Sequence, residues 1–145
     1  MKRILMLLLP AVTLAGQTIP FDGQPAGRPP GGWTVTMTHP GGPPRWMIVA
    51  DGTAPSGPNV LAQLSNDATS SRFPLAVYDA VSAADGTVRV KFKTISGKED
   101  RAAGIVWRFR DADNYYLVRA NALENNVVLY KVENGVRTAI APKME

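Results

Sequence analysis

Hydrophobic and polar residues alternate most regularly along Ala103–Lys131, and this stretch predicts three consecutive β-strands. The run Asp111–Asn114 lies between the first two strands. Its side chains bond their own backbone readily, so it predicts a tight turn. Successive side chains of a strand point to opposite faces, so this hairpin has two different faces. We expect the aromatic and aliphatic face in the core. We expect the arginine-bearing face to meet water, a ligand or a partner.

A four-residue loop at Asp111–Asn114 determines which side chains lie opposite each other in this hairpin. We expect the free face to contain Arg110 opposite Tyr115, Arg108 opposite Leu117 and Val106 opposite Arg119, and the core face to contain Phe109 opposite Tyr116, Trp107 opposite Val118 and Ile105 opposite Ala120.

Short runs of β-branched and aromatic residues, separated by turn residues, predict further strands in the rest of the chain. These strands are expected at residues 33–38, 45–50, 60–64, 73–78, 87–95 and 137–140. Pro74 confines its strand to an edge or a strand start, and Asn134-Gly135 predicts a two-residue hairpin. No segment shows sustained helical periodicity. The pattern therefore predicts an all-β fold, an antiparallel β-sandwich or jelly roll.

Composition agrees with one globular domain rich in turns. The chain has 145 residues, of which 45% are hydrophobic and 19% are charged, with 13 glycines and 12 prolines. The absence of cysteine excludes disulfides and thiol chemistry. Basic residues such as Arg89, Lys91 and Lys93 alternate with apolar ones instead of forming a contiguous patch, so we expect no nucleic-acid partner.

The first fifteen residues predict a secretory signal peptide. Lys2 and Arg3 precede the apolar run Ile4–Leu9, and Thr13-Leu14-Ala15 suits a cleavage site. Removal of residues 1–15 leaves a domain at 16–145, lowers the net charge from +4 to +2 and leaves no membrane span. An uncleaved buried helix is the alternative. The expected location is secreted or periplasmic.

Several motifs together resemble the 3-keto-disaccharide hydrolase domain family. They are Gly57–Gln63, Arg72–Asp79, Lys93–Asp100, Ala103–Arg108 and, most specifically, the run Asp113–Asn126. That family is similar to the concanavalin A-like lectin and glucanase sandwiches and is often labelled family 16-like glycoside hydrolase. The resemblance implies a bent jelly roll from an exported bacterial protein that is directed at carbohydrate.

The resemblance also predicts a domain that lacks its C-terminal strands. Domains of that family ordinarily continue with several more strands, whereas this chain stops at Ala141–Glu145. We therefore expect a C-terminally truncated jelly roll. Missing strands would leave sheet edges unpaired, and any activity carried by them would be absent.

The residues that bind metals are sparse. His39 is the single histidine and lies in a His-Pro-Gly-Gly turn, so we expect a solvated loop residue and no nitrogen or sulfur metal site. A structural calcium ion held by Asp22, Asp51 or the pair Asp111/Asp113 stays open, although that pair also suits a plain turn.

No catalytic residues can be named from the sequence, so enzyme activity stays uncertain. Glycoside hydrolysis needs two carboxyl groups about 5 to 9.5 Å apart. Glu99 and Asp100 are adjacent and point to opposite sides of an extended chain. Glu124 is a single acid, which faces a groove beside Asn121 and Arg119, pairs with an arginine, or caps the turn at Asn125-Asn126.

Sugar binding needs an aromatic face together with fixed planar donors and acceptors. The candidate ligand-binding residues are Arg108, Arg119, Asn121, Glu124 and Tyr115, with rings available from Trp33, Trp46 and Trp107. A solvated arginine face is the equally open alternative. Three functions follow: glycan binding, hydrolysis of 3-keto-disaccharides or related sugars, and a structural or interaction module. The glycan and the oligomeric state are not determined by the pattern.

Overall fold

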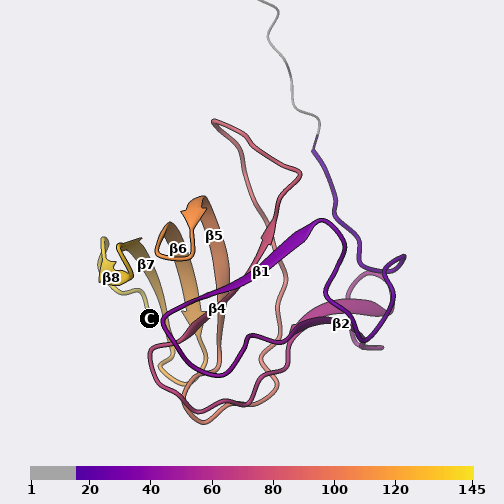
Figure 1. Cartoon of the computed structure of the whole chain (residues 1–145), viewed down its shortest axis with the longest axis horizontal. Helices are drawn as coiled ribbons and strands as arrows, with labels where there is room; N and C mark the ends of the chain where they lie inside the picture. The colour runs from indigo at the N-terminus through magenta and orange to yellow at the C-terminus, as the bar shows by residue number, and fades with distance from the viewer. Residues whose placement is uncertain (1–15) are drawn as a thin grey trace, which may run out of the picture.

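The computed structural model describes residues 16–145, and the predicted signal peptide at 1–15 lies outside the described part. The described residues contain eight strands and no helix, and every ladder is antiparallel. The strands are β1 (Trp33–Thr38), β2 (Trp46–Ala50), β3 (Asn59–Gln63), β4 (Phe73–Tyr78), β5 (Ala102–Asp111), β6 (Asn114–Asn121), β7 (Asn126–Glu133) and β8 (Val136–Ala139). They form a β1–β4 pair, a β2–β3 pair and a four-stranded sheet in the order β5-β6-β7-β8 (Figure 1).

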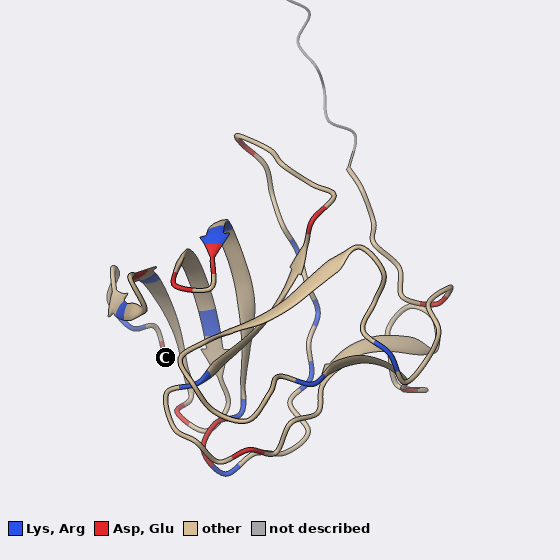
Figure 2. Cartoon of the chain, viewed as in Figure 1, with Lys and Arg blue, Asp and Glu red and all other residues tan. Residues whose placement is uncertain are grey.

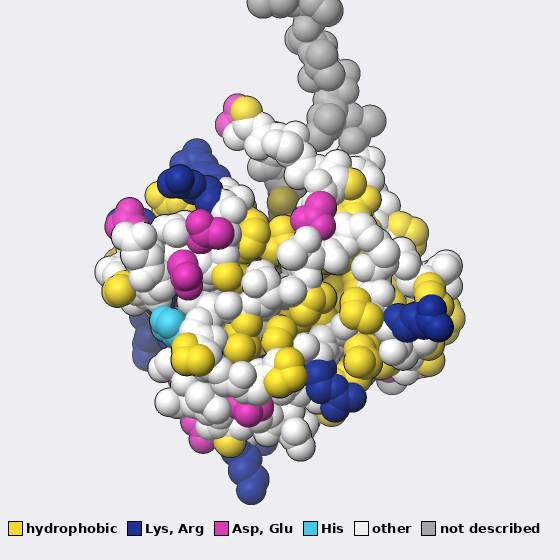
Figure 3. Space-filling model, in the orientation of Figure 1, with side chains coloured by type: hydrophobic (Ala, Val, Ile, Leu, Met, Phe, Trp, Pro, Cys, Tyr) yellow, Lys and Arg dark blue, Asp and Glu magenta, His cyan; other side chains and the backbone are white. Residues whose placement is uncertain are grey.

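The β1–β4 pair crosses in front of the four-stranded sheet and covers one of its faces (Figure 1). Leu75 of β4 packs there with Tyr115, Leu117 and Val132 of the larger sheet, and these four residues form the buried core cluster. Val106, Phe109 and Tyr130 pack against its margin. In the same orientation, Figure 3 shows apolar side chains gathered in the middle of this side of the molecule. The all-β, antiparallel fold predicted from the sequence is confirmed, and the arrangement of the sheets is consistent with a β-sandwich.

The β5–β6 hairpin contains a bulge that the sequence did not predict. Asp111 faces Asn114 as expected, but beyond the turn Trp107 faces Tyr116 instead of Val118. Three residues of β5 therefore lie opposite one residue of β6, and Arg108 within this bulge has a φ of 49°. Phe109 therefore packs at the margin of the core, as expected, but against Tyr115 instead of Tyr116, with ring centroids 6.2 Å apart.

The predicted inside and outside of this hairpin are reversed. Tyr115 and Arg119, expected on the free face, are 2% and 6% exposed. Trp107 and Tyr116, expected in the core, are half-buried on the opposite face with their rings stacked 5.9 Å apart. Only Arg108 and Arg110 of the predicted free face are exposed. The β1–β4 pair covers the face that carries Tyr115. The buried polar groups of Tyr115 and Arg119 have hydrogen-bond partners elsewhere in the chain, which offsets the cost of removing them from water.

The Tyr115 hydroxyl joins the two layers. Thr38 Oγ1 donates to the Ala112 carbonyl at 2.6 Å and lies 2.7 Å from the Tyr115 hydroxyl. Because the threonine hydroxyl has one proton, which Ala112 accepts, the tyrosine is the donor of the second bond. Burial raises the pKa of Tyr115 above its ordinary value, so this donor stays protonated.

Most of the predicted strands are present within a residue or two of their expected bounds. Residues 33–38 and 73–78 match β1 and β4, and Pro74 lies in a strand with a single neighbour among the described residues. Asn134 and Gly135 have φ values of 50° and 79° and join β7 to β8, as the two-residue hairpin signal predicts. No helix of the described residues is long and apolar enough to cross a membrane.

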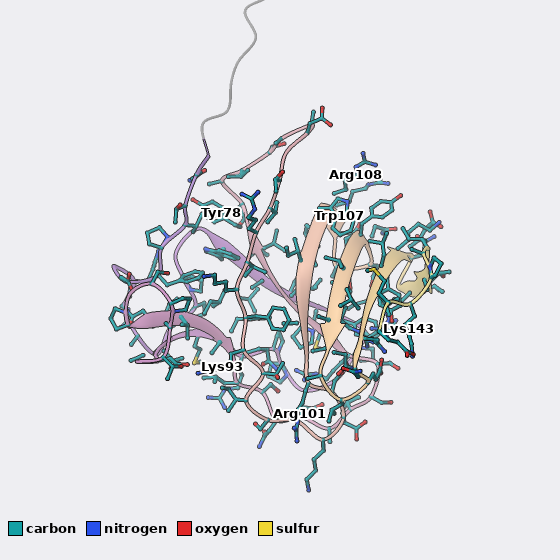
Figure 4. The ribbon with its side chains drawn as sticks, turned by 180° about the vertical axis from the view of Figure 1, so that it is seen from behind. Tyr78, Lys93, Arg101, Trp107, Arg108 and Lys143 are labelled. Carbon is teal, nitrogen blue, oxygen red and sulfur yellow. The ribbon has the colours of Figure 1, made fainter. Side chains whose placement is uncertain are left out.

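The strand predicted at 87–95 is wrong, because these residues are not part of any strand. These residues form no ladder with any described strand, although they run alongside β5, between it and the β2–β3 pair (Figures 1 and 4). Val88, Val90 and Phe92 are 66%, 55% and 48% exposed. An alternating pattern favours an extended chain, but it does not supply the neighbour that makes a strand.

We predict that Thr38→Val destabilises the protein more than Tyr115→Phe does. The valine leaves the buried tyrosine hydroxyl and the Ala112 carbonyl without their partner, at about 2–3 kcal/mol, whereas the phenylalanine removes one bond, at about 1 kcal/mol. Urea unfolding of both variants measures the difference. An equal or reversed order would contradict the assigned donor direction.

Candidate functional site

Three of the predicted ligand-binding residues meet in one polar cluster where β6 ends and β7 begins. We define the Arg119 cluster as Asp100, Arg119, Asn121, Glu124 and Asn126. The first turn residues after β6 carry Glu124 back toward Arg119, and β7 begins with Asn126, which lies opposite Asn121 in the ladder. Arg119, Asn121 and Asn126 are buried, whereas the side chains of Asp100 and Glu124 are 47% and 52% exposed.

The members of the Arg119 cluster bond one another. Arg119 donates through Nη2 to Glu124 at 2.5 Å and to Asn126 Oδ1 at 3.3 Å, and its Nη1 lies 3.7 Å from Asp100. Asn121 donates to Asp100, and Asn126 donates to Glu124 at 3.0 Å. The Arg119 Cζ also lies 5.5 Å from the centre of the Tyr130 ring. The planar groups that suit a sugar are thus largely engaged within the protein.

Electrostatics hold the Glu124 carboxylate in its charged form. The hydrogen bonds from Asn126 and then from Arg119 lower the pKa of Glu124 below its ordinary value of 4.5. An ionised carboxylate can accept hydrogen bonds from a ligand, but it cannot deliver a proton at neutral pH. The cluster resolves the alternatives for Glu124 in favour of pairing with an arginine.

The other two predicted site residues lie elsewhere. Tyr115 is buried against Thr38 in the core. Arg108 lies in the β5 bulge at the far end of the strand from Arg101, with its Cζ 5.9 Å from the Tyr116 ring (Figure 4). The five residues therefore do not form one surface, because the bulge and the covering β1–β4 pair separate them.

Of the acidic residues considered for calcium, Asp22, Asp51 and Asp111 have carboxylates that are bonded within the protein. Asp111 accepts from the Asp113 amide at 2.9 Å and from Asn114 at 2.8 Å, which is the plain turn. Asp51 pairs with Lys93 at 2.7 Å, and Asp22 accepts from the Asn59 amide at 3.1 Å. Among residues 16–145, no three His, Cys, Asp or Glu side chains come together in a way that could hold a metal ion. His39 is exposed in its turn, as predicted, and its Nδ1 lies 2.7 Å from the Ser71 carbonyl.

A second candidate site, missed by the sequence analysis, is a pocket of about 360 Å³ beside Trp33 and Tyr78. These two residues lie opposite each other at one end of the β1–β4 ladder, and their ring centroids are 5.2 Å apart. The ring centroid of Phe21 also lies 5.8 Å from that of Trp33. We call this the Trp33 pocket; its lining is Gln17, Thr18, Ile19, Pro20, Gly23, Gln24, Gly31, Trp33 and Tyr78.

Side-chain amides hold the wall of the Trp33 pocket in place. The Asn59 side chain lies within 3.5 Å of the carbonyls of Phe21, Asp22 and Gln24. Gln24 Oε1 accepts from the Gly31 amide at 3.1 Å. The pocket thus combines half-buried rings with polar groups whose positions are set by the fold.

The sequence carried a partial signal for the Trp33 pocket. Trp33 was considered as a source of rings, but no motif in residues 17–32 indicated a site there. Their position beside β1 depends on hydrogen bonds from Asn59, which lies far from them in the sequence. Such a contact cannot be read from local periodicity.

Comparison with models of known protein families, with curated proteins and with solved structures finds no match to this chain. The resemblance to 3-keto-disaccharide hydrolase domains therefore stays a prediction.

We predict that Arg119→Met lowers the free energy of unfolding by about 3 kcal/mol. The change keeps much of the side-chain volume but leaves Asn126 and two carboxylates without their shared buried donor. Chemical denaturation measures the loss. The matched control is Lys131→Met, which removes an exposed cation paired with Glu133 and should change stability little. Equal effects would mean that the cluster is not a structural centre.

We predict that the stabilising effect of Glu124 disappears in acid. Because its folded-state pKa is lowered, its contribution is fully present above about pH 4.5 and is lost as the pH falls through the folded value. The stability difference between the native protein and Glu124→Gln, measured by urea unfolding from pH 7 to pH 3, should therefore shrink. A difference that grows in acid would overturn the assigned direction.

Proposed function

We propose that this chain is an exported carbohydrate-binding domain of the concanavalin A-like jelly-roll type, and that the Trp33 pocket receives the sugar. The observation that carries the proposal is the combination of paired rings and amide side chains around one pocket of about 360 Å³. Sites for small ligands commonly measure about 300–1,000 Å³ and combine apolar walls with a few fixed polar groups.

The chemistry of the pocket suits a pyranose ring. A sugar presents an apolar face of C–H groups, which an aromatic ring covers, and an edge of hydroxyls, which amides can bind as both donors and acceptors. Trp33 and Tyr78 supply the rings, and Gln17 and Gln24 supply amides. Neither an acid nor a base lines the pocket, which favours a neutral sugar over a charged one.

Two further observations support the proposal. The described strands form an all-β, antiparallel, two-layer fold, which is compatible with a jelly roll. The motif run Asp113–Asn126 resembles carbohydrate-directed domains, and the pattern of residues 1–15 supports export to the periplasm or the medium.

Binding is favoured over hydrolysis. Asp100 and Glu124 are the two carboxylates that share a partner in the Arg119 cluster. A glycosidase needs one of its carboxyl groups to be protonated, with a raised pKa. The lowered pKa of Glu124 rules it out as the general acid of such a pair.

We predict that neutral gluco-oligosaccharides bind the purified chain and protect it from thermal unfolding. Calorimetric titration with cello-, laminari- and malto-oligosaccharides measures the affinity. Trp33→Leu should weaken binding by about tenfold, because losing a stacked ring costs on the order of 1.4 kcal/mol. Gln17→Ala should also weaken binding, and it removes no hydrogen bond observed among residues 16–145.

The matched control for Trp33 is Trp107→Leu. Trp107 is equally half-buried, but it lies on the outer face of β5, so its loss should leave sugar affinity unchanged. Circular dichroism checks that each variant is folded. The proposal is refuted if no tested glycan binds, or if the Trp107 and Trp33 variants lose affinity equally.

A further inference from the structure

An extended segment beside β5 has no strand partner within the described chain. We define the unpaired segment as residues 87–95, where apolar Val88, Val90 and Phe92 alternate with basic Arg89 and Lys91. Its residues are nearly all exposed. A run of this composition with free backbone donors and acceptors is a template for another strand.

The edge of β5 beside this segment is also open. The four-stranded sheet begins with β5, whose single ladder partner among residues 16–145 is β6. A groove of about 590 Å³ lies between the two stretches, lined by Val88, Arg89, Val90, Lys91 and Ile105. Both rims of the groove therefore carry backbone groups that no described strand satisfies.

The charges at the groove have a single sign. Arg89 and Lys91 form no ion pair among the described residues, and no acidic residue lines the groove. Lys93, farther along the segment, is bonded to Asp51 and Thr53. Figure 2 shows basic residues spaced along this part of the chain. The groove thus complements a negatively charged occupant.

We propose that this groove binds an extended segment of another polypeptide by β-strand addition, and that the bound segment alternates acidic and apolar residues. Its backbone pairs with the edge of β5 or with the unpaired segment, since neighbouring strands lie about 4.8 Å apart. Its carboxylates lie opposite Arg89 and Lys91. Its apolar side chains cover Val88, Val90 and Ile105.

The alternation of the lining favours a peptide over other anions. A nucleic acid would need a longer contiguous row of cations than Arg89 and Lys91 provide. Val88 and Val90 are apolar and 66% and 55% exposed, and a peptide strand can bury them with every second side chain. This inference does not depend on the Trp33 pocket, because no residue lines both sites.

The test uses the full chain and three fluorescently labelled peptides. One peptide alternates valine and glutamate, one alternates valine and lysine, and the third repeats the acidic sequence with alternate backbone nitrogens methylated. Fluorescence anisotropy should show binding of the acidic peptide only. The methylated peptide keeps its charge but cannot donate along the ladder. Its equal binding would overturn strand addition.

Charge reversal tests the assigned cations. Arg89→Glu combined with Lys91→Glu should weaken binding of the acidic peptide by at least about tenfold and should admit the lysine peptide. The control is Arg28→Glu with Lys98→Glu, which makes the same charge change at exposed residues outside the groove and should leave the affinity unchanged. Equal loss in both double variants would overturn the proposal. So would self-association of the chain that excludes every peptide.

Discussion

The buried hydroxyl of Tyr115 is the constraint on which the arrangement of the two layers depends. A phenol inside a core is stabilising only if its O–H finds an acceptor. Here the acceptor is the hydroxyl of Thr38, the last residue of β1, which in turn bonds Ala112 in the β5–β6 turn. This chain of two bonds fixes the end of β1 over the four-stranded sheet. It also decides which face of that sheet becomes interior.

The same strand connects the core to the Trp33 pocket. In the β1–β4 ladder, Thr38 lies opposite Phe73 at one end and Trp33 lies opposite Tyr78 at the other. One end is held by hydrogen bonds in the core, so the position of the other end, with its rings, follows from the rigidity of a six-residue strand. The Arg119 cluster lies at the end of β6 away from Thr38, and most of its hydrogen-bond donors are already engaged within the protein.

The sequence was sufficient for features set by local chemistry and insufficient for those set by distant packing. The strands at 33–38 and 73–78, the Asp111–Asn114 turn and the Asn134-Gly135 hairpin follow from local residue types, and all were predicted. The choice of buried face was predicted wrongly. Tyr115 and Arg119 have polar tips that suggest exposure, and their partners are identified only once the strands are assembled.

The candidate site shows the same division. Glu124 lies five residues from Arg119, and the sequence correctly offered an arginine as its partner. Asp100, which completes the cluster, lies just before β5 and comes close to Arg119 through the pairing of β5 with β6. In the sequence it was considered only as a neighbour of Glu99. The bulge at Arg108, which brings Phe109 against the core cluster, was not foreseen because a period-two pattern contains no information about a shift of register.

The ion pair between Lys93 and Asp51 has a mechanical consequence. It connects the unpaired segment, residues 87–95, to the loop between β2 and β3. The hydrogen bond from Lys93, together with those from Thr53, lowers the pKa of Asp51 well below its usual range. The tie survives mild acid, but it lies at the surface, where dissolved ions weaken it. Salt concentration, more than acidity, therefore determines how strongly residues 87–95 are held to the loop between β2 and β3.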